Sequence, residues 1–234
     1  KMKSIDGEII LVTGGAGGIG KLICLMLANL GAIVVVWDIN KAGKSISSIS
    51  QKSLQTEFIV SFMLNVLNCD TFNLILTNQA SEVTILINNA GVGRRFKFLD
   101  VTDKLLKRTI DVNVMSHFWM TKAFLPSMLE DNKGHIVSIA SLAGFVGVPY
   151  FVDYCTSKFA IIGFEEALHM ELIADGYDIN MTVICPFFIS NINENDKIDL
   201  YIHPLRFFRF LPRLLPNKVA DRVVTALRCN EKLV

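Results

Sequence analysis

The sequence predicts one α/β domain over residues 1–234, built on a doubly wound parallel sheet. Short apolar runs alternate with segments of helical length along the chain, which is the order expected of consecutive β–α–β units. The composition, with 51% hydrophobic and 19% charged residues, excludes a disordered chain. The net charge of +1 provides no electrostatic footprint for nucleic acid, so we expect no nucleic-acid partner.

Six runs rich in apolar and β-branched residues are the predicted strands. Their continuous apolar character is typical of parallel strands that are covered by helices on both faces. We expect these strands at Glu8–Thr13, Ile33–Trp37, Phe58–Leu64, Val83–Ile87, His135–Ile139 and Asn180–Ile184. We expect helices near residues 18–30, 41–52, 70–80, 102–129, 153–175 and 217–230. The expected spatial order of the strands is 3-2-1-4-5-6.

A glycine-rich loop follows the first predicted strand and opens a helix. It begins with Thr13 and Gly14 and ends with Gly18, Ile19 and Gly20. Glycines let the backbone approach a pyrophosphate, and the N-terminus of the helix offers N–H groups to an anion. A tight turn without a ligand is the simpler alternative. The strand–loop–helix order, however, is the context that a dinucleotide-binding Rossmann fold requires.

The acidic residue after the second strand predicts which cofactor binds. Asp38 occupies the place where a carboxylate accepts hydrogen bonds from the adenosine ribose and repels a 2′-phosphate. The nearest basic residue is Lys41. The sequence therefore favours NAD over NADP, although Asp38 taken alone could be a solvated turn residue.

A tyrosine and a lysine are spaced for acid–base chemistry. Tyr154 and Lys158 are four residues apart and would lie on one face of a helix. A phenol with a pKa near 10 is a poor base at neutral pH, and a neighbouring ammonium group lowers that pKa. We therefore expect Lys158 to lower the pKa of Tyr154, which exchanges the substrate's hydroxyl proton. An ordinary helix face is the alternative for this pair alone.

Further polar residues are expected around this pair. Ser141 follows the fifth strand and could bind the substrate oxygen beside Tyr154. The turn formed by Asn89, Ala90 and Gly91 closes the fourth strand and should lie beside the glycine loop. Asn113 lies in an apolar helical segment, where a buried amide needs partners. A water relay towards Lys158 and the satisfaction of a helix distortion are both open explanations.

Together these motifs resemble the short-chain dehydrogenase/reductase family over residues 8 to about 186. The resemblance implies a catalytic tetrad of Asn113, Ser141, Tyr154 and Lys158. It also implies that NAD is held by Thr13, Gly14, Gly18, Ile19, Gly20, Asp38, Asn65, Asn89, Ala90, Gly91, Tyr154, Lys158, Pro186 and Ile189. No metal is implied, and the histidines are not spaced as metal ligands.

Three segments narrow the resemblance: residues 37–40, 154–160 and 185–189. They are similar to the 16C branch of the family, which contains epidermal retinol dehydrogenase 2-like enzymes, member 6-like enzymes and lipid-droplet 17β-hydroxysteroid dehydrogenases. This resemblance implies an NAD-dependent oxidoreductase for a lipophilic alcohol or carbonyl, retinol-like or hydroxysteroid-like. It also implies a homodimer on the cytoplasmic face of the endoplasmic reticulum membrane or of a lipid droplet. The direction of the reaction stays open.

Three features depart from the family pattern. Asn65 replaces an aspartate that contacts the adenine, and Asn191 replaces a threonine that holds the nicotinamide carboxamide. The chain starts at Lys1 and stops at Val234, so we expect a truncated chain whose sheet lacks its last edge strand. These features support a second hypothesis, a cofactor-binding or interaction protein with little or no turnover. The intact tetrad argues against it.

The segment at about residues 187–216 is expected to face the substrate or a membrane. It combines aromatic residues with three arginines, Arg206, Arg209 and Arg213, which suits either an interfacial segment or a substrate lid. No apolar run reaches the length that spans a bilayer. Apolar residues in the loops after the fourth to sixth strands suit a long apolar alcohol, although core packing or a dimer interface would explain them as well.

Overall fold

The fold was analysed in a computed structural model of the chain. The structure describes residues 2–39, 58–62, 83–187, 189 and 214–233. The predicted helices at 41–52 and 70–80, together with Asn65 and Asn191, lie outside the described residues. So does most of the segment at 187–216.

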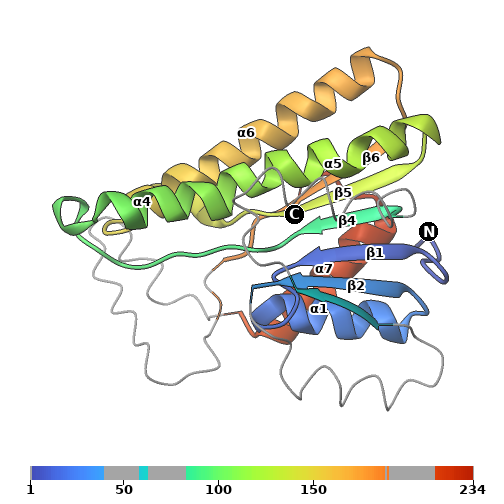
Figure 1. Ribbon diagram of the computed structural model, residues 1–234, viewed down its shortest axis with the longest axis horizontal. Coiled ribbons are helices and arrows are strands. Elements are labelled where there is room, and N and C mark those ends of the chain that lie inside the picture. The colour runs from blue at the N-terminus through green and yellow to red at the C-terminus, as the bar shows by residue number, and fades with distance from the viewer. Residues whose placement is uncertain (1, 40–57, 63–82, 188, 190–213, 234) are drawn as a thin grey trace.

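A parallel six-stranded sheet forms the centre of the fold (Figure 1), in the order β3-β2-β1-β4-β5-β6. The expected strand order is thus confirmed. The strands are β1 Ile9–Thr13, β2 Ile33–Asp38, β3 Phe58–Phe62, β4 Ile85–Asn88, β5 Gly134–Ile139 and β6 Ile179–Ile184. Because the order reverses between β1 and β4, a crevice for ligands is expected at the carboxyl ends of these two strands.

Helices cover both faces of the sheet, as the apolar strands predicted. Helices α1 (Gly18–Asn29) and α7 (Pro216–Cys229) cover one face, and α4 (Asp103–Ile110), α5 (Ser116–Glu130) and α6 (Val152–Ala174) lie on the other (Figure 1). Alternate strand residues face opposite sides. Val12 packs towards α1 and α7, whereas Leu11 packs towards α5. Each face therefore has its own apolar core.

The single helix expected at 102–129 is divided in the structure. After α4, a π-helical turn, η3, spans Asp111–Met115, and α5 follows at Ser116. A π-helical turn inserts an extra residue into the helix and often accompanies a functional site. Sequence periodicity does not reveal it, because the flanking residues keep the helical pattern.

Strand β6 forms one edge of the described sheet. A single parallel bridge joins Val183 to Leu233, and the Val183 N–H donates to the Lys232 carbonyl at 2.8 Å. In the described residues no full seventh strand follows β6.

Candidate active site

The glycine loop is fastened to the turn after β4 through Thr13. The Thr13 hydroxyl accepts hydrogen bonds from the N–H groups of Asn89 and Ala90, both at 3.0 Å. The Asn89 amide in turn donates to the carbonyls of Thr13, at 2.9 Å, and Gly14, at 3.2 Å. The loop and the turn after β4 are therefore one unit, which the sequence predicted only as neighbours.

Two glycines permit this close approach. A Cβ atom on Gly14, whose φ is +65°, would lie 2.9 Å from Cα of Ala90. A Cβ atom on Gly20 would lie 2.3 Å from the Gly14 carbonyl oxygen. Both distances are shorter than a carbon atom tolerates, so larger residues would push the loop away from the turn.

The other side of the loop is open and suits an anion. Gly17 is the N-cap of α1 and makes no side-chain capping hydrogen bond, and the first turn of the helix contains no acidic residue. Cβ atoms at Gly17 and Gly18 would meet nothing within 4 Å among the described residues. Because the first N–H groups of a helix lack partners within it, this cradle, with Ile19 in the first turn, fits the pyrophosphate of a dinucleotide.

Asp38 lies at the carboxyl end of β2, beside the same loop. Its Oδ2 accepts a hydrogen bond from the Ala16 N–H at 3.0 Å. The carboxylate therefore stabilises the loop and is half-buried at its rim, where a ribose bound to the cradle would meet it. This hydrogen bond goes beyond what a merely solvated turn residue makes, and the ribose role of Asp38 stays a prediction.

Asn113 is fully buried in the π-helical turn η3. Its Oδ1 accepts from the Val92 N–H at 2.8 Å, and its Nδ2 donates to the Val92 carbonyl at 2.8 Å and to the Ser157 hydroxyl at 2.9 Å. The amide thus joins η3, the turn after β4 and α6. These contacts support the helix-distortion explanation, and a relay of protons stays a prediction.

Tyr154 and Lys158 lie on α6 and meet the end of β5. The Lys158 ammonium donates to the Ile139 carbonyl at 2.8 Å and lies 5.7 Å from the centroid of the Tyr154 ring. Ser141 lies two residues after the end of β5, and its side chain interacts with the Tyr154 phenol so as to lower the pKa of that group. The Ser141 hydroxyl also accepts from the Ala143 N–H at 3.2 Å. The structure therefore brings these three predicted residues together.

The electrostatics differ from the expectation that Lys158 lowers the pKa of Tyr154. Burial raises the pKa of Tyr154 above its usual value, and the hydrogen bond with Ser141 opposes this. Burial also lowers the pKa of Lys158 to about 8. Desolvation dominates because both groups are enclosed by protein, and because the Lys158 ammonium is directed at Ile139 rather than at the phenol.

Two positions near Tyr154 and Lys158 were not found from the sequence. A Cβ atom on Gly93 would lie 2.7 Å from Cδ2 of Tyr154, and one on Gly144 would lie 2.8 Å from the Lys158 carbonyl oxygen. These glycines let the loops after β4 and β5 pack against α6. The only signal in the sequence was a glycine in each of the two loops. A glycine alone does not reveal which residue packs against it.

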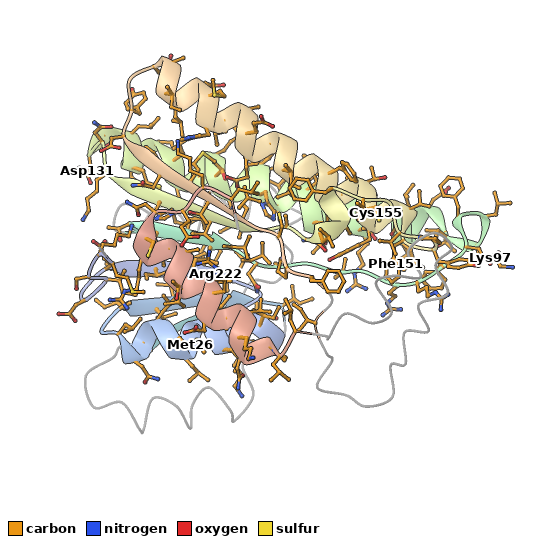
Figure 2. The ribbon with its side chains drawn as sticks, turned by 180° about the vertical axis from the view of Figure 1, so that it is seen from behind. Met26, Lys97, Asp131, Phe151, Cys155 and Arg222 are labelled. Carbon is orange, nitrogen blue, oxygen red and sulfur yellow. The ribbon has the colours of Figure 1, made fainter. Side chains whose placement is uncertain are left out.

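Three further predicted cofactor residues are Gly91, Pro186 and Ile189. Gly91 lies beside the tetrad, since its Cβ would be 3.7 Å from Oδ1 of Asn113 and 3.8 Å from Nζ of Lys158. The Pro186 carbonyl accepts from the Leu142 N–H at 3.0 Å, and Ile189 forms a bridge with Leu214. In Figure 2, Phe151 and Cys155 lie at the end of the molecule opposite Asp131.

Neither a metal-ligand cluster nor a membrane-spanning helix occurs in the described part of the chain. No group of three or more His, Cys, Asp or Glu side chains there is placed to hold a metal ion. None of the helices described is both long and apolar enough to cross a bilayer.

The fold and this constellation define a Rossmann-type scaffold with a glycine-rich cradle, and comparison with known proteins identifies its family. The family model for short chain dehydrogenases matches residues 8–198. The chain therefore belongs to the short-chain dehydrogenase family.

Its relatives lie in the expected branch. The chain is 45% identical over 194 residues to short-chain dehydrogenase/reductase family 16C member 6 of Bos taurus, covering 81% of this chain and 61% of that protein. It is 39% identical over 192 residues to epidermal retinol dehydrogenase 2 of Mus musculus, covering 80% and 62%. It is 36% identical over 239 residues to estradiol 17-beta-dehydrogenase 11 of Homo sapiens, covering 100% and 76%.

A solved structure shares the fold. A short chain dehydrogenase/reductase from Burkholderia phymatum, in complex with NAD, superposes with a TM-score of 0.82 at 23% identity, covering 100% of this chain and 90% of that one.

The chain spans about three fifths of the length of the first two relatives, 61% and 62%.

Proposed function

We propose that this chain is an NAD-dependent oxidoreductase that transfers a hydride between nicotinamide and a lipophilic alcohol or carbonyl, retinol-like or hydroxysteroid-like. One observation carries the proposal: Ser141, Tyr154, Lys158 and Asn113 converge at the carboxyl ends of β4 and β5. The glycine cradle beside them fits a dinucleotide.

Each residue has a part that its position supports. The Ser141 hydroxyl orients the substrate oxygen, and Tyr154 takes the alcohol proton as a phenolate, which the positive charges of bound NAD and of Lys158 would stabilise. Lys158 holds a positive charge near the phenol and binds the ribose, while Asn113 fixes the geometry of η3 against α6. Bound NAD would supply the hydride acceptor. A positioned acid–base group of this kind contributes about 10²–10⁴-fold to the rate.

The cofactor preference follows from Asp38. Its carboxylate sits at the rim of the cradle, where it would accept hydrogen bonds from an unphosphorylated ribose and repel a 2′-phosphate. This supports NAD rather than NADP.

The substrate class is supported by the relatives and by apolar surface at this end. Retinol and estradiol are lipophilic alcohols, and they appear in the names of two relatives. Phe145, Tyr150 and Val152, in the loop before α6 and at its start, are exposed. Such a rim favours an apolar ligand over a sugar or an acid.

We also propose an oligomeric state and a cellular location for this protein. Exposed apolar side chains on α5 and α6, including Phe118, Phe159 and Met170, support a homodimer that buries these helices. Peripheral contact with the endoplasmic reticulum membrane or a lipid droplet, on the cytoplasmic side, is proposed from the resemblance to the 16C branch. Sedimentation at increasing concentration tests the dimer.

The deciding experiment is an NADH-production assay. Retinols, hydroxysteroids and long-chain alcohols are offered in liposomes with NAD or NADP, and the reverse reaction is followed with the matching aldehydes and ketones. We expect NADH formation with at least one lipophilic alcohol. Thermal stabilisation by NAD without turnover in either direction would support the alternative of a cofactor-binding protein instead, which the converging tetrad disfavours.

A further inference from the structure

Helix α6 contains a further buried polar residue, Glu165, to which the proposed reaction gives no role. Glu165 lies seven residues, or about two helical turns, beyond Lys158 and is only 2% exposed. The Ser138 hydroxyl of β5 donates to its Oε1. Its other oxygen, Oε2, has no hydrogen-bond partner among the described residues. A carboxyl group buried in this way needs a reason.

Ser138 connects Glu165 to a neighbouring helix. The Ser138 oxygen lies 3.1 Å from Nδ1 of His117 on α5. A hydroxyl that donates to Glu165 can accept from an Nδ1–H of His117. Burial lowers the pKa of His117 to about 3, with the positive charge of Lys158 adding to the effect. His117 is therefore neutral, and the three groups form one chain across α5, β5 and α6.

This chain is attached to the site at the next residue of β5. Ser138 holds Glu165, and Ile139, which follows it, accepts the hydrogen bond of the Lys158 ammonium at 2.8 Å. Helix α6 is thus fixed to the end of one strand at two points, by the reactive lysine and by an acid two turns away. A shift at the second point would move the first.

We propose that Glu165 is a positioning residue, which fixes α6 to the end of β5 through Ser138 and so sets the place of Lys158 and Tyr154. This inference rests on the proposed function for its effect on turnover. The attachment of α6 itself is independent of that function.

The protonation state of Glu165 gives the attachment a pH dependence. Burial raises the pKa of its carboxyl from 4.5 to about 8, and the hydrogen bond from Ser138 opposes this. The titratable groups on the helices beside Glu165 include His117 on α5, and Lys158 and His169 on α6. Within the described residues, none of these three groups forms an ion pair with a carboxylate. Above pH 8 Glu165 becomes a buried anion, and the cost of desolvating this charge destabilises the packing of α6 against β5, although the Ser138 hydrogen bond favours the anion.

Three variants test the proposal. Glu165→Gln keeps the shape and an acceptor for Ser138 but cannot ionise, and Glu165→Ala removes the contact. Glu166→Gln, one residue on and exposed, is the control. A misplaced reacting group can cost on the order of 10²-fold in rate. We therefore expect Glu165→Ala to lower kcat by about 10- to 100-fold, with little change in KM for NAD.

The conservative variant separates positioning from simple stability. We expect Glu165→Gln to restore kcat at pH 7 to nearly the wild-type value and to keep it above pH 8, where the wild-type kcat falls. Glu166→Gln should follow the wild type at each pH. A folded Glu165→Ala variant with unchanged kcat would overturn the proposal, as would equal pH profiles for Glu165→Gln and the wild type.

A measurement without substrate keeps the two proposals apart. Glu165 binds its proton more tightly in the folded than in the unfolded chain, so its stabilising effect is present below pH 4.5 and is lost as the pH rises through 8. The Tm of the wild type should therefore fall, relative to that of Glu165→Gln, between pH 5 and 9. Parallel Tm curves would overturn the role of Glu165, whatever the activity assay gives. No turnover by the wild type, with diverging Tm curves, would overturn the proposed function alone.

Discussion

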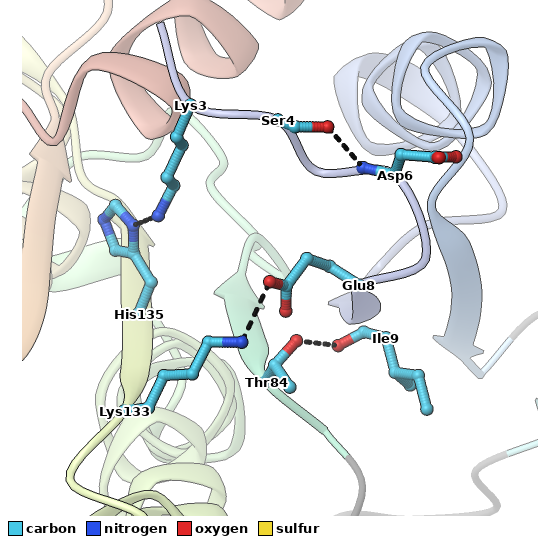
Figure 3. A network of polar contacts seen from close by, with 8 residues as sticks. All are labelled: Lys3, Ser4, Asp6, Glu8, Ile9, Thr84, Lys133 and His135. Carbon is cyan, nitrogen blue, oxygen red and sulfur yellow. Dashed lines mark hydrogen bonds and ion pairs between the residues drawn. The ribbon is translucent and has the colours of Figure 1, made fainter.

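Two pairs of lysine and histidine, Lys3 with His135 and Lys158 with His117, lie near opposite ends of the central strands, and they differ in how many of the polar atoms around them have hydrogen-bond partners. At the amino end, Nζ of Lys3 lies 3.0 Å from Nδ1 of His135, as Figure 3 shows. Nε2 of His135 lies 2.8 Å from the Thr182 hydroxyl, which donates to the Glu231 carbonyl. This chain of contacts joins both terminal segments to β5 and β6.

At the carboxyl end, around Lys158 and His117, fewer of the buried polar atoms have a hydrogen-bond partner. Lys158 makes one hydrogen bond, to Ile139, within the described part of the chain. Nearby, Nδ2 of Asn88 and Oε2 of Glu165 have no partner there. Burial lowers the pKa of both histidines to about 3, so a shifted pKa does not distinguish the two ends. The two ends of the sheet differ because polar atoms without hydrogen-bond partners lie at the carboxyl end, where the strand order reverses.

The largest expected effect is on the tyrosine at the carboxyl end. Tyr154→Phe removes the phenolic oxygen and should lower kcat by about 10²–10⁴-fold while NAD affinity, measured by calorimetry, stays unchanged. Tyr177→Phe, at an exposed ring beyond the end of α6, is the control and should keep its turnover. If Tyr154→Phe turned over at the wild-type rate, the carboxyl end would lose its catalytic assignment.

Asp38 should have the next largest effect. Asp38→Ala removes the ribose acceptor and the hydrogen bond from Ala16, so NAD binding should weaken by about 1.5–3 kcal/mol, the range for hydrogen bonds to charged groups. NADP binding should weaken less because a repulsive charge is removed with it. Both affinities are measured by fluorescence titration. Asp178→Ala, at the other end of the molecule, should change neither, and an unaltered ratio of NAD to NADP affinity would contradict the ribose role.

The open cradle can be tested without disturbing the fold. Gly17→Ala adds a methyl group where the structure leaves space, so the Tm should hardly change, while a methyl group facing the pyrophosphate should weaken NAD binding by roughly 1–3 kcal/mol. The matched control is Gly163→Ala on α6, which is also open. It should raise stability by about 0.5–1 kcal/mol and leave NAD binding alone. Equal NAD affinities for the two variants would exclude a pyrophosphate at the cradle.

The smallest effect on activity is expected at the amino end. His135→Gln removes a ring that contacts Lys3 and Thr182, so it should lower the free energy of unfolding at pH 7 by about 1–3 kcal/mol without changing kcat. The folded-state pKa of about 3 lies below the ordinary 6.5. The stabilisation by His135 is therefore present above pH 6.5 and is lost as the pH falls towards 3.

Denaturant unfolding at several pH values checks this sign. The difference between wild type and His135→Gln should shrink as the solution becomes more acidic. If this difference in the free energy of unfolding grew in acid, or if His135→Gln had a reduced kcat, the two ends of the sheet would not differ in the way described.

Local patterns were sufficient for much of the fold and the site. Continuous apolar runs predicted the strands because parallel strands are buried on both faces. The loop from Thr13 to Gly20 and the spacing of Tyr154 and Lys158 predicted their places because a few neighbouring residues fix a turn or a helix face. The same patterns failed at the π-helical turn within 102–129, where the distortion is stabilised by contacts of Asn113 with Val92 and Ser157.

The sequence by itself determined the family scaffold, the order of its elements and the residues that meet at the carboxyl ends of the strands. Only the tertiary structure decided their environment. It showed that burial raises the pKa of Tyr154, that Gly93 packs against its ring, and that Glu165 is enclosed beside Ser138 and His117. The reason is physical: spacing along a chain fixes which side chains share a face, but desolvation and hydrogen-bond partners depend on elements distant in sequence.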